Sequence, residues 1–108
     1  MEQAKTLVDL GTSIKTRKDL SVIFTKNNCP MCQMLFIRVG SMEDEGEIET
    51  PIMIHNIEDD DYEKASELYD LSSTPTMVRF KDGKEIGRAS SIGLSPEKFE
   101  ELDTGNIE

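Results

Sequence analysis

With 108 residues, the chain is long enough for one domain with a single core of about four or five strands and a few helices, and we expect residues 1–108 to form that domain. Its net charge of −10 disfavours nucleic acid and anionic membrane surfaces as partners, so a charged partner should be basic or locally neutral. No stretch approaches about eighteen apolar residues, and the N-terminus lacks the basic-then-apolar order of a secretory signal, which predicts a cytoplasmic protein.

The first predicted element is an amphipathic helix within residues 2–17. Apolar residues recur at helical spacing from Leu7 to Ile14. A short strand over residues 6–10, followed by a helix from Thr12, is the alternative, because threonine is a good N-cap residue. We therefore expect a sheet of four strands, or of five if an N-terminal strand forms.

Residues 20–25 form the predicted central strand, and the helix after it begins with a Cys-x-x-Cys pair. Pro30 fits the first helical turn, where a missing N–H costs nothing, so Cys29 lies at or beside the N-cap and Cys32 lies one turn later. We expect this helix to end near Gly40. Its predicted apolar face comprises Met31, Met34, Leu35 and Ile37.

The two cysteines are the chemically distinctive residues of the sequence. Exposed N–H groups and the positive end of the helix dipole favour an anion, so Cys29 should have a lower pKa than Cys32 and be the better thiolate. One alternative is half of a zinc site, which needs two further nitrogen or sulfur ligands when only His55 remains, and so would be shared across a dimer. Another is a structural disulfide, but so short a loop constrains the unfolded chain little. Redox chemistry explains the pair better.

An acidic segment and a second apolar run follow. Residues 41–50 contain five carboxylates and predict a solvated loop or a poorly ordered helix extension, with a docking patch as the alternative. Residues 52–57 are short enough to be a strand. His55, the only histidine, has a side chain suited to acid–base chemistry, but a strand could equally turn it towards the other face as a structural residue.

A short capped helix precedes the C-terminal third. Acidic residues at 59–61 lie where a first turn and cap are expected, before the segment YEKASELYDL. The residues predicted to share one face of this helix are Tyr62, Ala65, Leu68 and Tyr69.

The C-terminal third changes from helical to strand periodicity. Residues 77–80 and 85–88 flank an Asp-Gly turn, which is the strongest hairpin signal in the chain. Ser95 and the following proline then start a last helix, with Phe99 and Leu102 on its buried side. We expect the tail from Asp103 to be frayed.

The order of these elements predicts a topology. Strand, helix, strand, helix, hairpin and helix give an α/β fold with a mixed sheet and helices on both faces. The right-handed crossover rule makes the first two strands parallel, and the hairpin adds antiparallel edge strands.

The chain resembles the thioredoxin superfamily from about Leu20 to Leu102. Two motifs carry the resemblance: the helix-opening Cys29-Pro30-Met31-Cys32, and Thr74-Pro75 before a hairpin. The segment YDLSSTPT, the hairpin FKDGKEIGR and the lead GLS into the last helix are similar to thioredoxins, whereas VIFTKNNCPMC is similar to glutaredoxins and glutaredoxin-like reductants of ribonucleotide reductase.

The resemblance implies a thioredoxin-like fold with a central mixed sheet of four or five strands. It also implies that the Thr74–Pro75 bond is cis, that Pro75 lies against the dithiol, and that Thr74 offers backbone hydrogen bonds to an incoming substrate. We take Thr74 and Pro75 as the substrate-docking residues.

Two departures from the family pattern concern charged groups. Thioredoxins carry a buried aspartate six residues before the first cysteine, where this chain has Ile23, and the neighbouring lysine is replaced by Ile54. Losing both is coherent, because one buried charge without the other would be costly. No side chain is thereby assigned as the base for Cys32.

Lys26 matches a lysine that glutaredoxins carry three residues before the first cysteine. The glutathione-binding Gly-Gly-Asp signature after the hairpin is missing, because residues 88–93 read RASSIG. We therefore expect reduction by a flavin-dependent thioredoxin reductase rather than by glutathione. Lys26, Pro30 and Met31 are candidate modulators of the dithiol.

These observations predict a monomeric, cytoplasmic thiol–disulfide oxidoreductase that reduces protein disulfides, with a role in electron transport and cell redox homeostasis. Cys29 attacks and Cys32 resolves the mixed disulfide. We expect no metal, no organic cofactor, and no nucleic-acid or membrane partner. The alternative is a non-enzymatic thioredoxin-fold binding module with an acidic docking face.

Overall fold

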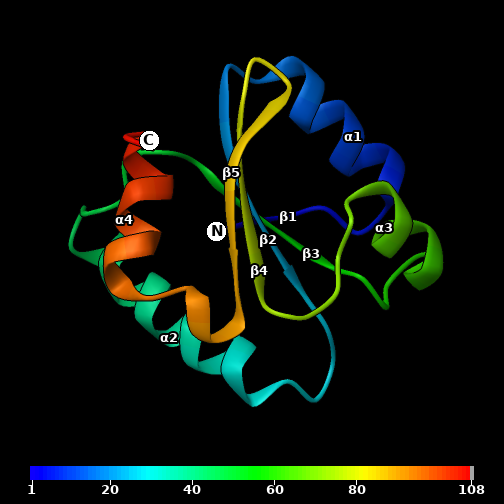
Figure 1. Ribbon diagram of the computed structural model, residues 1–108, viewed down its shortest axis with the longest axis horizontal. Coiled ribbons are helices and arrows are strands. Elements are labelled where there is room, and N and C mark those ends of the chain that lie inside the picture. Colours follow the sequence, from blue (N-terminus) through cyan, green and yellow to red (C-terminus); the bar gives the residue numbers. More distant parts are fainter. Residues whose placement is uncertain (108) are drawn as a thin grey trace.

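The computed structural model, which describes residues 1–107, contains a mixed sheet of five strands between two pairs of helices (Figure 1). The strands are β1 (Glu2–Gln3), β2 (Asp19–Thr25), β3 (Ile52–Asn56), β4 (Thr76–Lys81) and β5 (Lys84–Ser90). The helices are α1 (Leu7–Thr16), α2 (Pro30–Asp44), α3 (Tyr62–Leu68) and α4 (Pro96–Thr104), with a 3₁₀ turn η1 (Ser91–Gly93) before α4. The predicted α/β fold with a mixed sheet is confirmed, and the fifth strand is present.

The sheet is built around β2. Its strand order is β1-β3-β2-β4-β5, with β3 parallel to β2 and β4 antiparallel to it. The predicted parallel pairing is confirmed, but the hairpin contributes only one edge, because β4 lies between β2 and β5. Every residue of β2 after Asp19 is buried, which explains its continuous apolar run: a strand covered on both faces needs no alternation.

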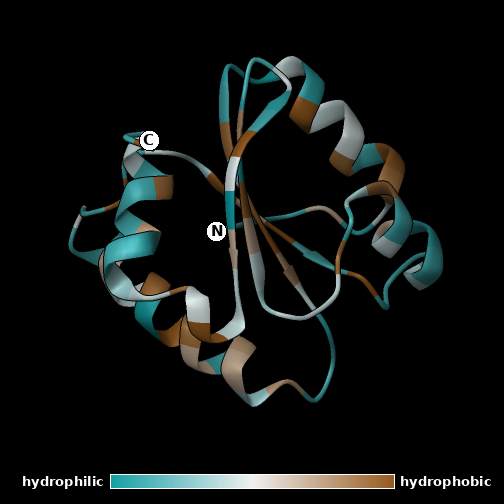
Figure 2. Ribbon diagram, viewed as in Figure 1, coloured by the Kyte–Doolittle hydropathy of each residue, from teal (hydrophilic) through white to brown (hydrophobic). Residues whose placement is uncertain are grey.

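Two hydrophobic clusters hold the helices to the two faces of the sheet. The helices α1 and α3 cover one face and α2 and α4 cover the other (Figure 1). Val22 and Phe24 of β2 belong to the first cluster and Ile23 to the second, as strand alternation requires. Figure 2 shows hydrophobic residues along the central strands and hydrophilic residues over much of α4. None of the helices within residues 1–107 combines the length and the apolar composition needed to cross a membrane.

The N-terminal segment resolves the two alternatives left by the sequence. Thr6 caps α1, its hydroxyl oxygen accepting a hydrogen bond from the Asp9 N–H at 3.1 Å. The predicted first helix is therefore confirmed over Leu7–Thr16, and a strand over residues 6–10 is wrong. The fifth strand lies earlier, where Glu2 and Gln3 pair in parallel with β3.

Helix α2 does not end at Gly40, as the sequence predicted. It continues to Asp44, because Val39 is buried in the second cluster and Met42 packs against it. The turn that follows contains Gly46 at φ 72°, a left-handed conformation that glycine adopts without strain. The first part of the acidic segment is therefore ordered helix, and its second part is loop.

The helix α3 follows its predicted cap but only part of its predicted face. The Asp61 carboxylate accepts a hydrogen bond from the Lys64 N–H at 3.0 Å. Ala65 is buried and Tyr69 packs against the first cluster, but Tyr62 and Leu68 are exposed. Only two of the four residues predicted to share a buried face of α3 and its C-terminal end therefore pack against the core.

The C-terminal elements confirm the hairpin and the last helix but not a frayed tail. Asp82 and Gly83 both have positive φ, as a two-residue type I′ turn requires. In α4, Phe99 and Leu102 are fully buried, as predicted. Asp103 is also buried, and its carboxylate accepts hydrogen bonds from the N–H groups of residues 49 and 50, which anchors α4 to the loop before β3.

Candidate active site

The cysteine pair lies at the start of α2, just after the turn that connects β2 to this helix. The turn between them uses Asn28 at φ 53°, a left-handed conformation that asparagine tolerates better than most residues. The Asn27 N–H donates a hydrogen bond to Glu58 Oε1 at 2.8 Å, and the Asn27 side-chain oxygen accepts one from Asn56 Nδ2 at 2.9 Å. These bonds fix the turn to the segment after β3 and so fix the start of α2.

Cys29 is the N-cap of α2, and Pro30 is its first residue. The Cys29 Sγ accepts a hydrogen bond from the Cys32 N–H at 3.3 Å, so one of the free N–H groups of the first turn points at this sulfur. The two cysteines form a disulfide, with Cα atoms 5.2 Å apart. Cys29 is 6% exposed and Cys32 is 1% exposed, so Cys29 is the more accessible of the two residues.

The Thr74–Pro75 bond is cis, as predicted. This loop lies against the cysteine pair: the Cys29 Sγ is 3.7 Å from the Thr74 hydroxyl oxygen and 3.9 Å from its carbonyl oxygen. The Ser91 N–H donates a hydrogen bond to the Pro75 carbonyl at 2.8 Å, which ties η1 to the loop. Residues far apart in the sequence thus meet around Cys29.

The two apolar departures lie side by side. Ile23 of β2 and Ile54 of β3 are register partners, as neighbouring positions should be. That they replace the family's aspartate and lysine stays a prediction. Ile23 is fully buried, and Ile54 lines a recess beside Cys29 and Cys32. Neither strand presents a carboxylate at this position, and within residues 1–107 no group of three or more histidine, cysteine or acidic side chains is placed to hold a metal ion.

The candidate modulators lie around the pair in different ways. Lys26 lines the same recess as both cysteines, and Pro30 opens the helix. Met31 is exposed and faces a groove on the other side of the pair. Their roles as modulators stay predictions.

His55 lies apart from the cysteine pair. It is fully buried in β3, its Nδ1 lies 2.8 Å from the Ala4 carbonyl oxygen, and its ring meets the edge of Phe24 at 6.2 Å between centroids. It shares its side of the strand with Met53, which belongs to the cluster under α1 and α3. This environment supports the structural interpretation of His55.

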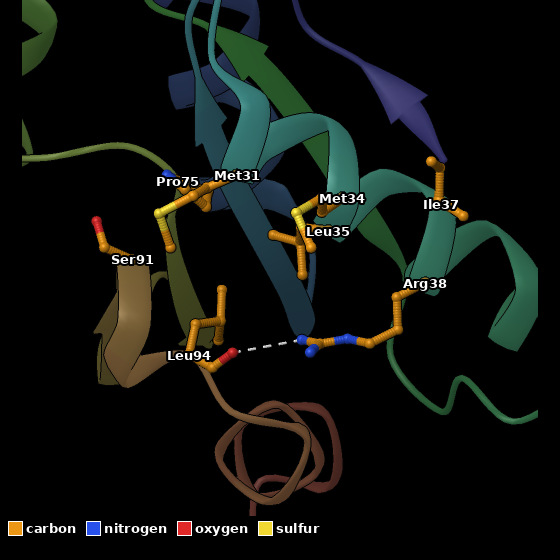
Figure 3. A pocket seen from close by; sticks show the side chains of 8 residues that line it. All are labelled: Met31, Met34, Leu35, Ile37, Arg38, Pro75, Ser91 and Leu94. Atoms are coloured by element: carbon orange, nitrogen blue, oxygen red, sulfur yellow. Dashed lines mark hydrogen bonds between the residues drawn. The ribbon is translucent and has the colours of Figure 1, made fainter.

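A groove of about 380 Å³ runs along α2 from the cis-proline loop (Figure 3). We call it the α2 groove, and its apolar lining consists of Met31, Met34, Leu35, Ile37, Pro75 and Leu94. The predicted apolar face of α2 is wrong in this respect: Met34 is 70% and Ile37 is 75% exposed, whereas the side packed on the sheet carries Cys32, Leu35 and Val39. Apolar residues lie on two sides of this helix, so periodicity could not assign one buried face.

Sequence reasoning missed two parts of this site. Ser91 and Leu94 reach it through η1, which no local pattern predicted, and Arg38 closes the far end of the α2 groove. The acidic segment lies at the other end of α2 from Cys29, where Glu43 forms an ion pair with the N-terminal amine at 3.1 Å. Its use as a docking patch stays a prediction.

Comparison with known proteins identifies a family and sequences that are similar to this chain. A family model described as a thioredoxin-like domain matches residues 8–102. The chain is 38% identical to a thioredoxin from Chlamydia caviae over 66 residues, which is 61% of this chain and 60% of that protein. The match therefore spans less than two thirds of that relative's length.

Solved structures share the fold over nearly the full chain. Fasciola hepatica thioredoxin superposes with a TM-score of 0.78 at 25% identity, covering 99% of this chain and all of that one. Reduced Schistosoma mansoni thioredoxin pre-protein superposes with a TM-score of 0.80 at 20% identity, with the same coverage. The second likeness shows the fold alone.

Proposed function

The chain belongs to the thioredoxin-like domain family, and from that premise we propose that it is a thiol–disulfide oxidoreductase that reduces protein disulfides. The observation that carries the proposal is the position of the Cys29 Sγ at the start of α2. This sulfur accepts a hydrogen bond from the Cys32 N–H and lies 3.7 Å from the Thr74 hydroxyl oxygen. The attacking sulfur and the docking loop are therefore adjacent. A thiolate at a helix N-terminus is stabilised by such donors and by the helix dipole.

The reaction begins from the reduced pair. The Cys29 thiolate attacks one sulfur of the substrate disulfide, and the substrate's other sulfur leaves as a thiolate and takes up a proton. The bond formed is a mixed disulfide between Cys29 and the substrate. Cys32 then loses its proton and attacks the Cys29 Sγ, which restores the intramolecular disulfide and releases the second substrate thiolate. Two electrons pass from the protein to the substrate.

Thr74 and Pro75 have the docking role in this proposal. The Thr74 carbonyl and hydroxyl lie beside Cys29, and the Ser91 hydroxyl donates a hydrogen bond to that carbonyl at 3.4 Å. An extended substrate segment can form backbone hydrogen bonds with this loop while its disulfide lies over Cys29. The side chains of Ile23 and Ile54 cannot accept a proton, and we assign water as the acceptor of the Cys32 proton.

We assign the return of electrons to a flavin-dependent thioredoxin reductase. The support is the segment after β5, RASSIG, which lacks the Gly-Gly-Asp signature for glutathione. Turnover with glutathione and glutathione reductase, and none with thioredoxin reductase, would contradict this assignment. We also propose that residues 1–108 act as one monomeric domain. We propose that the protein works in the cytoplasm, because both cysteines belong to the redox motif and none is left to form a structural disulfide.

Insulin reduction by dithiothreitol tests the proposal. The wild-type protein should accelerate precipitation of the insulin B chain, and Cys29→Ser should not, with circular dichroism confirming that both are folded. A wild-type protein that adds nothing to the dithiothreitol background would contradict the proposal and favour a binding module without catalysis.

A further inference from the structure

The α2 groove is not used by the steps above, although it begins at the docking loop. Met31 and Pro75 lie at its end nearest the cysteine pair, and Arg38 lies at the other end (Figure 3). Exposed methionine side chains are flexible and polarizable, so they can adapt to apolar side chains of several shapes. The groove therefore suits a polypeptide segment better than one rigid ligand.

Among residues 1–107, Arg38 is the only charged residue that lines the α2 groove. Its Nη2 donates a long hydrogen bond of 3.4 Å to the Leu94 carbonyl, and its guanidinium lies over the Phe99 ring at 5.8 Å. The Nε is buried and faces away from solvent, whereas Nη1 forms no hydrogen bond and Arg38 forms no ion pair with any carboxylate among residues 1–107. The guanidinium is thus a partly buried cation with donors left for an anion.

The length of the groove sets the reach of a bound segment. At about 1.5 Å per residue, α2 places Arg38 about 13 Å along the helix axis from Cys29. An extended chain rises about 3.3 Å per residue, so it covers this distance in about four residues. Alternate side chains of such a segment point to the same face, so the second residue from the cysteine would meet the apolar part of the groove.

We infer that the α2 groove selects substrates: an apolar side chain of the substrate lies against Met31 and Met34, and a carboxylate about four residues from the substrate cysteine pairs with Arg38. This inference rests on the proposed reduction of protein disulfides. It names a preferred sequence around the disulfide: cysteine, an apolar residue two positions away, and an acidic residue about two positions further.

The net charge of the protein makes this preference diagnostic. A chain with a net charge of −10 attracts cationic peptides and repels anionic ones over distances up to the Debye length of about 8 Å at physiological salt. The general field alone therefore ranks a lysine peptide above a glutamate peptide. Pairing with Arg38 predicts the opposite ranking.

The test uses peptides that each contain one cysteine and are joined as symmetric disulfide dimers. Leucine occupies the second position from the cysteine and glutamate, glutamine or lysine the fourth, in one series towards the N-terminus and in one towards the C-terminus. The protein is reduced with dithiothreitol, separated from it, and mixed with each dimer. Acid quenching and chromatography give the second-order rate constant. Bis(2-hydroxyethyl) disulfide, a neutral disulfide without peptide flanks, measures how fast the wild-type protein reduces a disulfide that makes no peptide contacts with the groove.

In one of the two series the wild-type protein should reduce the glutamate peptide about tenfold faster than the lysine peptide, as expected for a charge-assisted hydrogen bond at a partly buried site. Arg38→Gln should remove this ranking and Arg38→Glu should reverse it. Lys64→Glu makes the same change in net charge on an exposed residue of α3, across the sheet, and should keep the wild-type ranking.

The outcomes separate the inference from the proposed function. A wild-type protein that reduces bis(2-hydroxyethyl) disulfide but ranks lysine peptides first or all peptides equally would overturn the inference alone. A ranking that Arg38→Glu leaves unchanged would do the same. Rates that fall as the protein concentration rises would show a second copy of the chain in the groove, which also overturns it. No reduction of any disulfide would contradict the proposed function itself.

Discussion

Replacing Ile23 with aspartate tests how the protein manages without charges beneath its dithiol. Ile23 is fully buried in the second cluster, and its register partner in the neighbouring strand β3 is Ile54. Removing a buried isoleucine side chain costs about 1.5–3 kcal/mol of transfer free energy. Burying an unpaired carboxylate costs about 3–5 kcal/mol more.

We therefore expect Ile23→Asp to lower the free energy of unfolding by at least about 4 kcal/mol at pH 7, a large part of the roughly 5–15 kcal/mol of a typical domain. Ile23→Val, the matched control, should cost about 0.5–1.5 kcal/mol. Adding Ile54→Lys to Ile23→Asp should recover part of the loss, because the lysine places an opposite charge beside the carboxylate.

Urea unfolding at several pH values measures these effects. Burial should raise the folded-state pKa of the new aspartate above its unfolded value near 3.9, so the charge-burial cost is absent below about pH 4 and grows as the pH rises towards 7. An Ile23→Asp loss at pH 7 no larger than that of Ile23→Val would show that water reaches this position, and it would refute the reasoning.

Three further predictions address the thiols, the α4 anchor and alkaline stability. Limiting iodoacetamide near neutral pH should label Cys29 of the reduced protein before Cys32, because the helix N-terminus stabilises its thiolate; mass spectrometry showing the reverse order would contradict this. Asp103→Ala should lower the free energy of unfolding by about 2–4 kcal/mol in urea, because two backbone N–H groups lose their acceptor; a loss below about 1 kcal/mol would show that water replaces the carboxylate. Burial raises the pKa of Tyr69 above its ordinary value. The stability that this residue contributes should therefore be fully present below about pH 10 and be lost as the pH rises through the folded-state pKa. The free energy of unfolding of Tyr69→Phe should depend less on pH in this range, and an unchanged dependence would contradict the prediction.

Local signals made the centre of the fold predictable. The apolar run of β2, the polar turn and the Cys-Pro start of α2 follow one another within a dozen residues, and each has its own physical cause. The Asp82-Gly83 turn and the Ser95 cap are equally local. These signals depend on backbone conformation and capping, which the neighbouring residues decide.

The missed features depend on contacts between distant residues. Nothing in Glu2 and Gln3 predicts a strand, because their pairing is with β3. The helix α2 passes Gly40 because Met42, a later apolar residue, packs against the second cluster. The exposed side of α2 lines a groove together with Ser91 of η1 and Leu94. Asp103 looked like part of a polar tail, yet its acceptors lie near N–H groups more than fifty residues away in the chain.

The same distinction applies to the candidate site. The sequence motif identified Cys29 and Cys32, and the family resemblance identified Thr74 and Pro75. The fold brings the hydroxyl and carbonyl oxygens of Thr74 within 4 Å of the Cys29 sulfur. Arg38 carried no motif, and only the packing of η1 and Leu94 against α2 makes it part of a groove.

Intact-mass measurement of a trapped intermediate tests the central claim most directly. Reduced Cys32→Ser and Cys29→Ser variants are mixed with a disulfide substrate such as insulin, and their masses are recorded without reductant. Cys32→Ser should accumulate a mixed disulfide with the substrate through Cys29, because attack proceeds and resolution cannot. Cys29→Ser should accumulate none. A mixed disulfide on Cys29→Ser but not on Cys32→Ser would reverse the two roles and contradict the account.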